Sequence, residues 1–116
     1  MSQNAAARFV EDHGGLDAWS GECLAVGLIL LAQYLCSEVL WVSLDPDLNS
    51  IGWHYHVVPL IDGRTHCAWH EHLVTDVEDY LAEVFPQEGA VQSVQRLASV
   101  EEVMQAMRAW DLQFAA

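Results

Sequence analysis

The sequence holds 116 residues, of which 53% are hydrophobic and 18% are charged, a balance typical of one folded domain over residues 1–116. Seventeen acidic residues stand against four arginines and no lysine, so the formal net charge at pH 7 is −13. That charge disfavours nucleic acids, anionic membranes and acidic substrates as direct partners, and it favours a basic partner.

No segment is typical of secretion or of membrane insertion. The longest apolar run, residues 24–32, is too short to span a bilayer, and the N-terminus has no basic patch followed by an apolar core. Three cysteines, an odd number, show no spacing of a disulfide framework. We therefore expect reduced thiols in a cytoplasmic protein.

Two helices are predicted ahead of the first strand. Residues 4–12 form a short helix that the Gly14-Gly15 pair ends. Ser20 is the expected N-cap of a second helix that runs to about Cys36. Apolar residues surround this second helix on every side, which predicts that it is buried at the centre of the fold.

Three strands are predicted to follow. Residues 38–44 (EVLWVSL) and 53–60 (WHYHVVPL) are rich in β-branched and aromatic residues, and the polar segment 45–52 between them has turn chemistry. The Asp-Gly pair at 62–63 is a strong hairpin signal, and it leads into a third strand at 64–69.

Two capping boxes mark the later helices: Thr75 with Glu78, and Ser99 with Glu102. Between these helices, residues 90–97 are predicted to form an edge-like strand. The order of elements predicts an α+β domain, in which a buried central helix packs on a small antiparallel sheet of three to four strands with flanking helices.

The candidate chemistry lies at one cysteine and in a cluster of histidines. A helix N-terminus lowers the pKa of a thiol, so Cys23 is a candidate nucleophile, and a small core residue is the alternative. His54 and His56 lie two apart on a predicted strand and should share a face.

Zinc binding is an alternative for the histidines. His56, Cys67, His70 and His72 could supply a set of nitrogen and sulfur ligands for zinc. Their spacing matches no standard zinc site, so no metal or cofactor is expected.

The stretch SGECLAVGLILLAQYLC, followed by HVVPLIDGRTHCAW, resembles the minimal core of papain-like and transglutaminase-like cysteine hydrolases. In that family a Cys opens a buried helix, a His begins a strand, and an Asp or Asn on the next strand orients the His. The resemblance places a nucleophile at Cys23 and a base at His56, and it implies a small thiol hydrolase or transferase. The orienting acid is not matched, because Cys67 stands near its position, and this weakens the triad.

The helix predicted at 75–85 carries acids on its non-apolar face: Asp76, Glu78, Asp79 and Glu83. Such a carboxylate row can imitate phosphates, because arginine and lysine bind both. Glu71, Glu101 and Glu102 would extend the row if the last helix packs alongside.

Small size, high negative charge and the absence of lysine resemble phage-encoded DNA mimics, among them anti-CRISPR proteins that block a Cascade-type surveillance complex. This resemblance implies an inhibitor without enzyme activity that acts in the bacterial cytoplasm. We therefore expect an acidic inhibitor that binds the nucleic-acid-binding surface of a basic partner protein, with the thiol hydrolase as the alternative.

Overall fold

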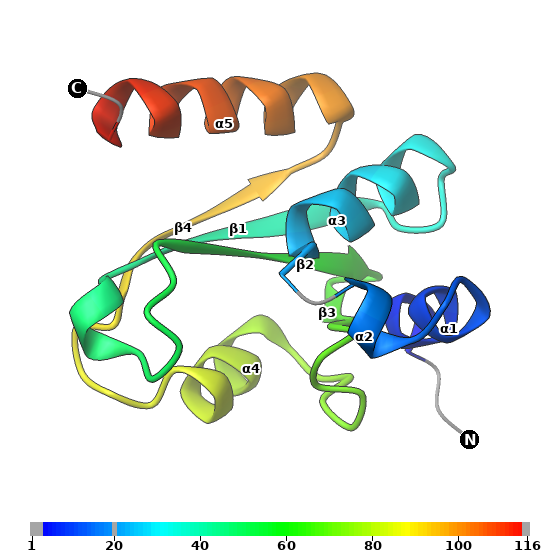
Figure 1. Cartoon of the computed structure of the whole chain (residues 1–116), viewed down its shortest axis with the longest axis horizontal. Helices are drawn as coiled ribbons and strands as arrows, with labels where there is room; N and C mark the ends of the chain where they lie inside the picture. Colours follow the sequence, from blue (N-terminus) through cyan, green and yellow to red (C-terminus); the bar gives the residue numbers. More distant parts are fainter. Residues whose placement is uncertain (1–3, 20, 115–116) are drawn as a thin grey trace.

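The computed structural model describes residues 4–19 and 21–114. Its elements combine helices with one antiparallel sheet of four strands, which confirms the predicted α+β class (Figure 1). In chain order they are α1 (Ala5–Asp12), α2 (Leu16–Trp19), α3 (Cys23–Ala32), β1 (Glu38–Leu44), η1 (Pro46–Leu48), β2 (Tyr55–Ile61), β3 (Arg64–Thr65), α4 (Val77–Val84), β4 (Val91–Leu97) and α5 (Val100–Phe114).

The strand order across the sheet is β3-β2-β1-β4, so β1 and β2 lie inside the sheet and β3 and β4 form its edges. Every pairing is antiparallel, and β1 has β2 on one side and β4 on the other. The β-branched and aromatic residues of β1 suit this central place, because its residues 39–42 are all buried.

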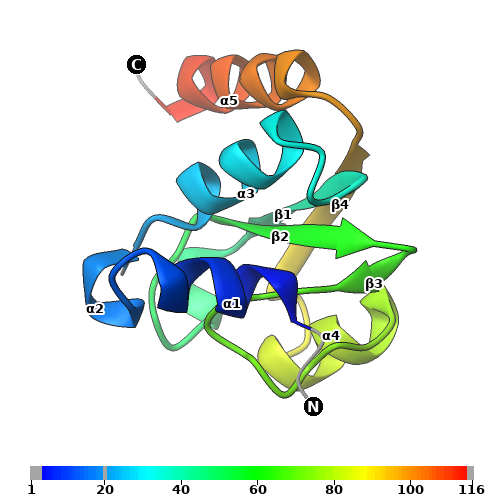
Figure 2. The same cartoon turned by 90° about the vertical axis from the view of Figure 1, so that its right-hand side faces the viewer.

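Helices cover both faces of the sheet (Figures 1 and 2). α3 and α5 lie over one face and α4 lies over the other, while α1 packs beside α3 and α2 packs beside α1. Because successive strand residues point to opposite faces, the core is divided into two clusters. Val39, Trp41 and Val57 join the cluster under α3, whereas Leu40, Val42 and Val58 join the cluster under α4.

The central helix is shorter than the sequence predicts. α3 begins at Cys23 with Glu22 at its N-cap, and the predicted cap Ser20 lies outside the described residues. The helix ends at Ala32, and Tyr34 adopts a left-handed conformation with φ 58°. A left-handed residue ends a helix, so the apolar residues up to Cys36 leave the helix axis. No helix in the described residues is both long and apolar enough to cross a bilayer.

Two further predictions need correction. The third strand holds only Arg64 and Thr65, and the chain then turns into a loop that enters the core. The N-cap of α4 is Asp76 rather than Thr75, since the Asp76 side chain accepts a hydrogen bond from the Asp79 backbone N–H at 2.9 Å.

The predicted cap residue of α5, Ser99, is confirmed, but the Glu102 side chain bonds one residue further back than a capping box requires. The Glu102 backbone N–H donates to Ser99 Oγ at 3.2 Å, and the Glu102 carboxylate accepts from the backbone N–H of Ala98 at 2.6 Å. Both bonds satisfy backbone groups that would otherwise be left unpaired at a helix start.

Candidate functional site

Cys23 opens α3, as predicted, but its thiol is not activated. Burial raises the pKa of the Cys23 thiol above its usual value, and the nearby Glu22 carboxylate adds to that rise. Hydrogen bonds to the backbone of Val57 and of Leu24 lower the pKa by less. The thiol therefore stays protonated at neutral pH, and the effect of the helix N-terminus is outweighed.

A cleft of about 220 Å³ lies beside Cys23. The residues that line it include Trp53, His54, Tyr55 and Trp110, and the rings of His54 and Tyr55 contact the Trp110 ring. Tyr55 begins β2, and His54 directly precedes the strand, while Trp110 comes from α5. His54 is therefore the imidazole that shares a cleft with the Cys23 thiol.

His56 does not share that cleft. Its neighbours on β2, Tyr55 and Val57, pack with the cluster under α3, whereas the His56 ring contacts α4. Cys23 and His56 thus lie on opposite faces of the sheet. The structure does not bring together the nucleophile and the base that the resemblance to cysteine hydrolases implies. The prediction that His54 and His56 share a face is wrong, because β2 begins only at Tyr55.

His56 belongs instead to a buried polar cluster under α4. Its Nε2 atom lies 3.1 Å from the Tyr80 hydroxyl and 3.6 Å from Cys67 Sγ, and Cys67 Sγ lies 3.3 Å from His70 Nδ1. The Trp53 ring stacks on the His56 ring with centroids 4.7 Å apart. The cluster joins β2, α4 and the loop after β3 through polar contacts inside an apolar core.

Burial keeps the members of this cluster neutral. It lowers the pKa of His56 to about 3 and also lowers the pKa of His70. Burial likewise raises the pKa of the Cys67 thiol and of the Tyr80 hydroxyl. A thiol and imidazoles that are all neutral do not form the thiolate–imidazolium pair that nucleophilic catalysis needs.

The zinc alternative gains no support from the geometry. Within residues 4–19 and 21–114, no group of three or more His, Cys, Asp or Glu side chains is placed to hold a metal ion. His72, one member of the candidate set, is exposed, whereas His56 is completely buried.

The acids of α4 are exposed, as the sequence predicts. We call Asp76, Glu78, Asp79 and Glu83 the α4 acidic surface. Among the described residues the one ion pair within 4.0 Å joins Glu38 to Arg96, so no described cation pairs with this surface. Glu71, in the loop that precedes α4, is exposed as well.

Glu101 and Glu102 do not extend the α4 acidic surface. They begin α5, which lies on the opposite side of the sheet from α4 in both views (Figures 1 and 2). The sequence could not show this, because the side on which a helix packs depends on the direction of the chain after β4.

Two other exposed acids lie near the C-terminal end of α4. The Asp45 backbone N–H donates to the carbonyl of Ala90 at 2.9 Å, which joins the η1 loop to the segment that follows α4. This contact brings Asp47 and Glu88, both exposed, to the same region of the molecule. It is a long-range contact with no short sequence signal, so the sequence alone does not place either residue beside α4.

Comparison with known proteins found no matching protein family, no similar curated sequence and no similar solved structure.

Proposed function

We propose that this protein is an acidic inhibitor that binds the nucleic-acid-binding surface of a basic partner protein. The carboxylates of the α4 acidic surface would take the place of DNA phosphates on that partner. A CRISPR surveillance complex is the partner that the resemblance to phage-encoded inhibitors suggests. The observation that carries the proposal is a row of exposed carboxylates without a described cation beside it, on a chain of net charge −13.

The spacing of the carboxylates supports electrostatic mimicry. Residues 76–83 cover roughly 10 Å of helix axis at about 1.5 Å per residue. B-DNA carries about six phosphates over that length, counting both strands, so the four acids of α4 form a sparser row. Asp47 and Glu88 at one end of α4, and Glu71 in the loop before it, supply further charge on this side of the sheet.

The test uses a Cascade-type surveillance complex loaded with guide RNA and its target duplex. The unaltered protein should displace the duplex, and its affinity should fall steeply between about 50 and 500 mM NaCl, because released counterions and screening act on such contacts. The Asp79→Lys/Glu83→Lys variant should bind at least about tenfold more weakly, since two attractive charges become repulsive.

The matched control is Glu101→Lys/Asp111→Lys on α5. Both double variants change the net charge from −13 to −9, but the control places the change on the other side of the sheet. The control should keep most of the affinity. Equal losses in the two variants would make binding a general charge effect, and binding without salt dependence would refute DNA mimicry.

A thiol hydrolase or transferase that acts through Cys23 is the second candidate. It is favoured by the cleft that the Cys23 thiol shares with His54. Because burial raises the pKa of this thiol, we predict that iodoacetamide labels Cys23 more slowly at pH 7 than it labels free cysteine. Intact mass against time, with Cys23→Ser as the control, measures this rate. Selective labelling faster than that of free cysteine would restore the hydrolase.

A further inference from the structure

β4 is an edge strand whose outer side is open. It pairs with β1 on one side only, and no strand follows it in the sheet order. Residues 92–96, five in a row, are exposed, so neither face of β4 is covered over this stretch. A cleft of about 450 Å³ lies between α5 and the side chains of Ser93, Gln95 and Leu97, so α5 does not pack closely on this part of the strand. Backbone donors and acceptors on such an edge are available to another strand.

The devices that usually protect an edge strand are mostly missing from β4. Its seven residues, VQSVQRL, include no proline, no lysine and no acid. The pairing with β1 is irregular only where Ser43 and Leu44 meet the beginning of β4, and it is regular from Ser93 to Leu97. Long, regular edges with few charges are those that pair with further strands.

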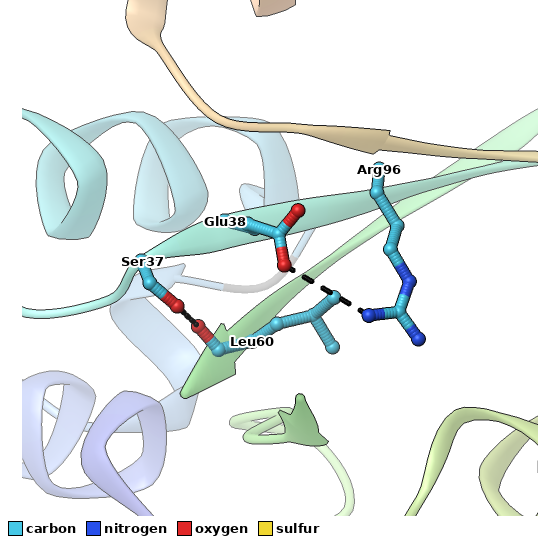
Figure 3. A network of polar contacts seen from close by, with 4 residues as sticks. All are labelled: Ser37, Glu38, Leu60 and Arg96. Atoms are coloured by element: carbon cyan, nitrogen blue, oxygen red, sulfur yellow. Dashed lines mark hydrogen bonds and ion pairs between the residues drawn. The ribbon is translucent and has the colours of Figure 1, made fainter. Parts of the chain in front are cut away.

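The charge distribution favours a second copy of the chain at this edge. Two molecules of net charge −13 repel each other over most of their surface, but residues 89–100 contain no acid. The one charged residue of β4, Arg96, pairs with Glu38 at 3.8 Å across the sheet (Figure 3). The repulsion between two copies is therefore smallest where the two β4 strands meet.

We propose that two copies of this protein associate by antiparallel pairing of β4 with β4, around a twofold axis at Val94. In this register Val94 lies opposite Val94 of the second copy, and Ser93 lies opposite Gln95. The two Arg96 side chains are at opposite ends of the pairing, each opposite a Gln92. The two sheets then form one continuous sheet of eight strands.

The register follows from the side chains. Val94 is 39% exposed, so pairing buries an apolar side chain that the monomer leaves in water. In this register the apolar Val94 faces its own copy, and each polar residue faces another polar residue. The two arginines do not face each other, which is favourable because like charges directly opposite destabilise a strand pair.

The first experiment is sedimentation equilibrium from 1 µM to 1 mM protein, chosen to cover the roughly micromolar to millimolar affinities of modest interfaces. Dimer formation should strengthen as NaCl rises from roughly 0.05 to 0.5 M, because salt screens the repulsion between two acidic molecules. Binding to the basic partner of the proposed function should weaken over the same range, so the failures of the two proposals are distinguishable. A monomer at every salt and protein concentration would overturn the inference.

The second experiment tests the register with Val94→Lys. This variant places two positive charges opposite each other at the axis and should weaken the dimer by about tenfold. Val100→Lys is the matched control, because Val100 is 38% exposed, lies outside β4 and gives the same net charge. The control should dimerise as the unaltered protein does. Equal weakening in both variants would show that β4 is not the interface.

A mixture completes the test. Val94→Lys and Val94→Glu should each be monomeric at a concentration where their equimolar mixture forms dimers, since the axis then holds one opposite-charge pair. Only a residue that lies opposite its own copy gives this result. A mixture that stays monomeric would reject the axis at Val94. Circular dichroism melts verify that the variants remain folded.

Discussion

The His56 imidazole is fully buried in the cluster under α4, and its charge state links the fold to pH. Its neighbours are the Tyr80 hydroxyl, the Cys67 thiol and the rings of Trp53 and Phe85. The Nδ1 atom has no hydrogen-bond partner among the described residues. Protonation would place a positive charge in this apolar space without a carboxylate to balance it, and burial therefore lowers the pKa of His56 to about 3.

This shift predicts that acid destabilises the protein well above the pH at which most carboxyl groups titrate. The unfolded chain binds a proton at His56 below its usual pKa of 6.5, whereas the folded chain does not until about pH 3. Stability is thus complete above pH 6.5 and is lost as the pH falls towards 3. His56 alone should remove about 2 kcal/mol of unfolding free energy between pH 7 and pH 5, measured by urea denaturation.

Two variants separate His56 from other titrating groups. His56→Leu should flatten the pH dependence, although it also lowers stability by removing one hydrogen-bond partner of the Tyr80 hydroxyl. His72→Gln removes an exposed histidine and should keep the full slope. If His56→Leu loses stability between pH 7 and pH 5 as steeply as the unaltered protein, another group causes the loss. His70, whose pKa burial also lowers, is the first alternative.

At the scale of elements, the close approach of α3 to β2 depends on Gly27. A Cβ atom at this buried position would lie 2.8 Å from Val57 Cγ1 and 3.4 Å from Val39 Cγ1. An alanine ordinarily stabilises a helix interior by about 1 kcal/mol relative to glycine. Here the clash forces the helix away from the sheet, and overpacking of that kind typically costs about 1–3 kcal/mol.

We predict that Gly27→Ala lowers the unfolding free energy by about 1 kcal/mol, the sign opposite to that expected from helix propensity. Urea denaturation of four proteins forms a double-mutant cycle: the unaltered chain, Gly27→Ala, Val57→Ala, and both together. Removing the Val57 methyl groups makes room for the new Cβ, so the cost of Gly27→Ala should shrink in the Val57→Ala background. Additive effects would show that the Val57 contact does not determine the packing distance.

The sequence predicts the class of the fold and the nature of most elements, because hydrophobic periodicity and capping residues are local signals. It fails where the outcome depends on distant parts of the chain. The left-handed turn at Tyr34 ends α3 early, and the third strand stops after Thr65 because the chain turns into the core.

The same limit applies to the candidate sites. Alternation along the predicted strand places His54 and His56 on one face. β2 begins only at Tyr55, however, so His54 falls outside the alternation and lines the cleft beside Cys23, whereas His56 packs under α4. The exposure of the α4 acids is predicted correctly, since it follows from helical spacing alone. Their grouping with Asp47 and Glu88 rather than with Glu101 and Glu102 depends on tertiary packing.

At the scale of the whole molecule, repulsion among the negative charges lowers the unfolding free energy of the protein. The chain carries seventeen acids and four arginines in a small molecule, whose radius of gyration is 13.5 Å. The described residues form one ion pair. Unfolding moves these charges apart, so self-repulsion favours the unfolded chain. The Debye length falls from about 10 Å at 0.1 M salt to about 3 Å at 1 M, which removes most of this repulsion.

The unfolding free energy should therefore rise by about 1–2 kcal/mol between 20 and 500 mM NaCl, as measured by urea denaturation at pH 7.5. The dependence reflects the summed charge, so Asp79→Lys/Glu83→Lys and Glu101→Lys/Asp111→Lys should reduce it by similar amounts, although they lie on opposite sides of the sheet. Both variants should remain folded at low salt, where repulsion matters most. A loss of partner binding in the α4 variant then reports on the surface and not on unfolding. A stability that does not change with salt would mean that the acids are too far apart to repel, and the same spacing would make them a poor imitation of phosphates.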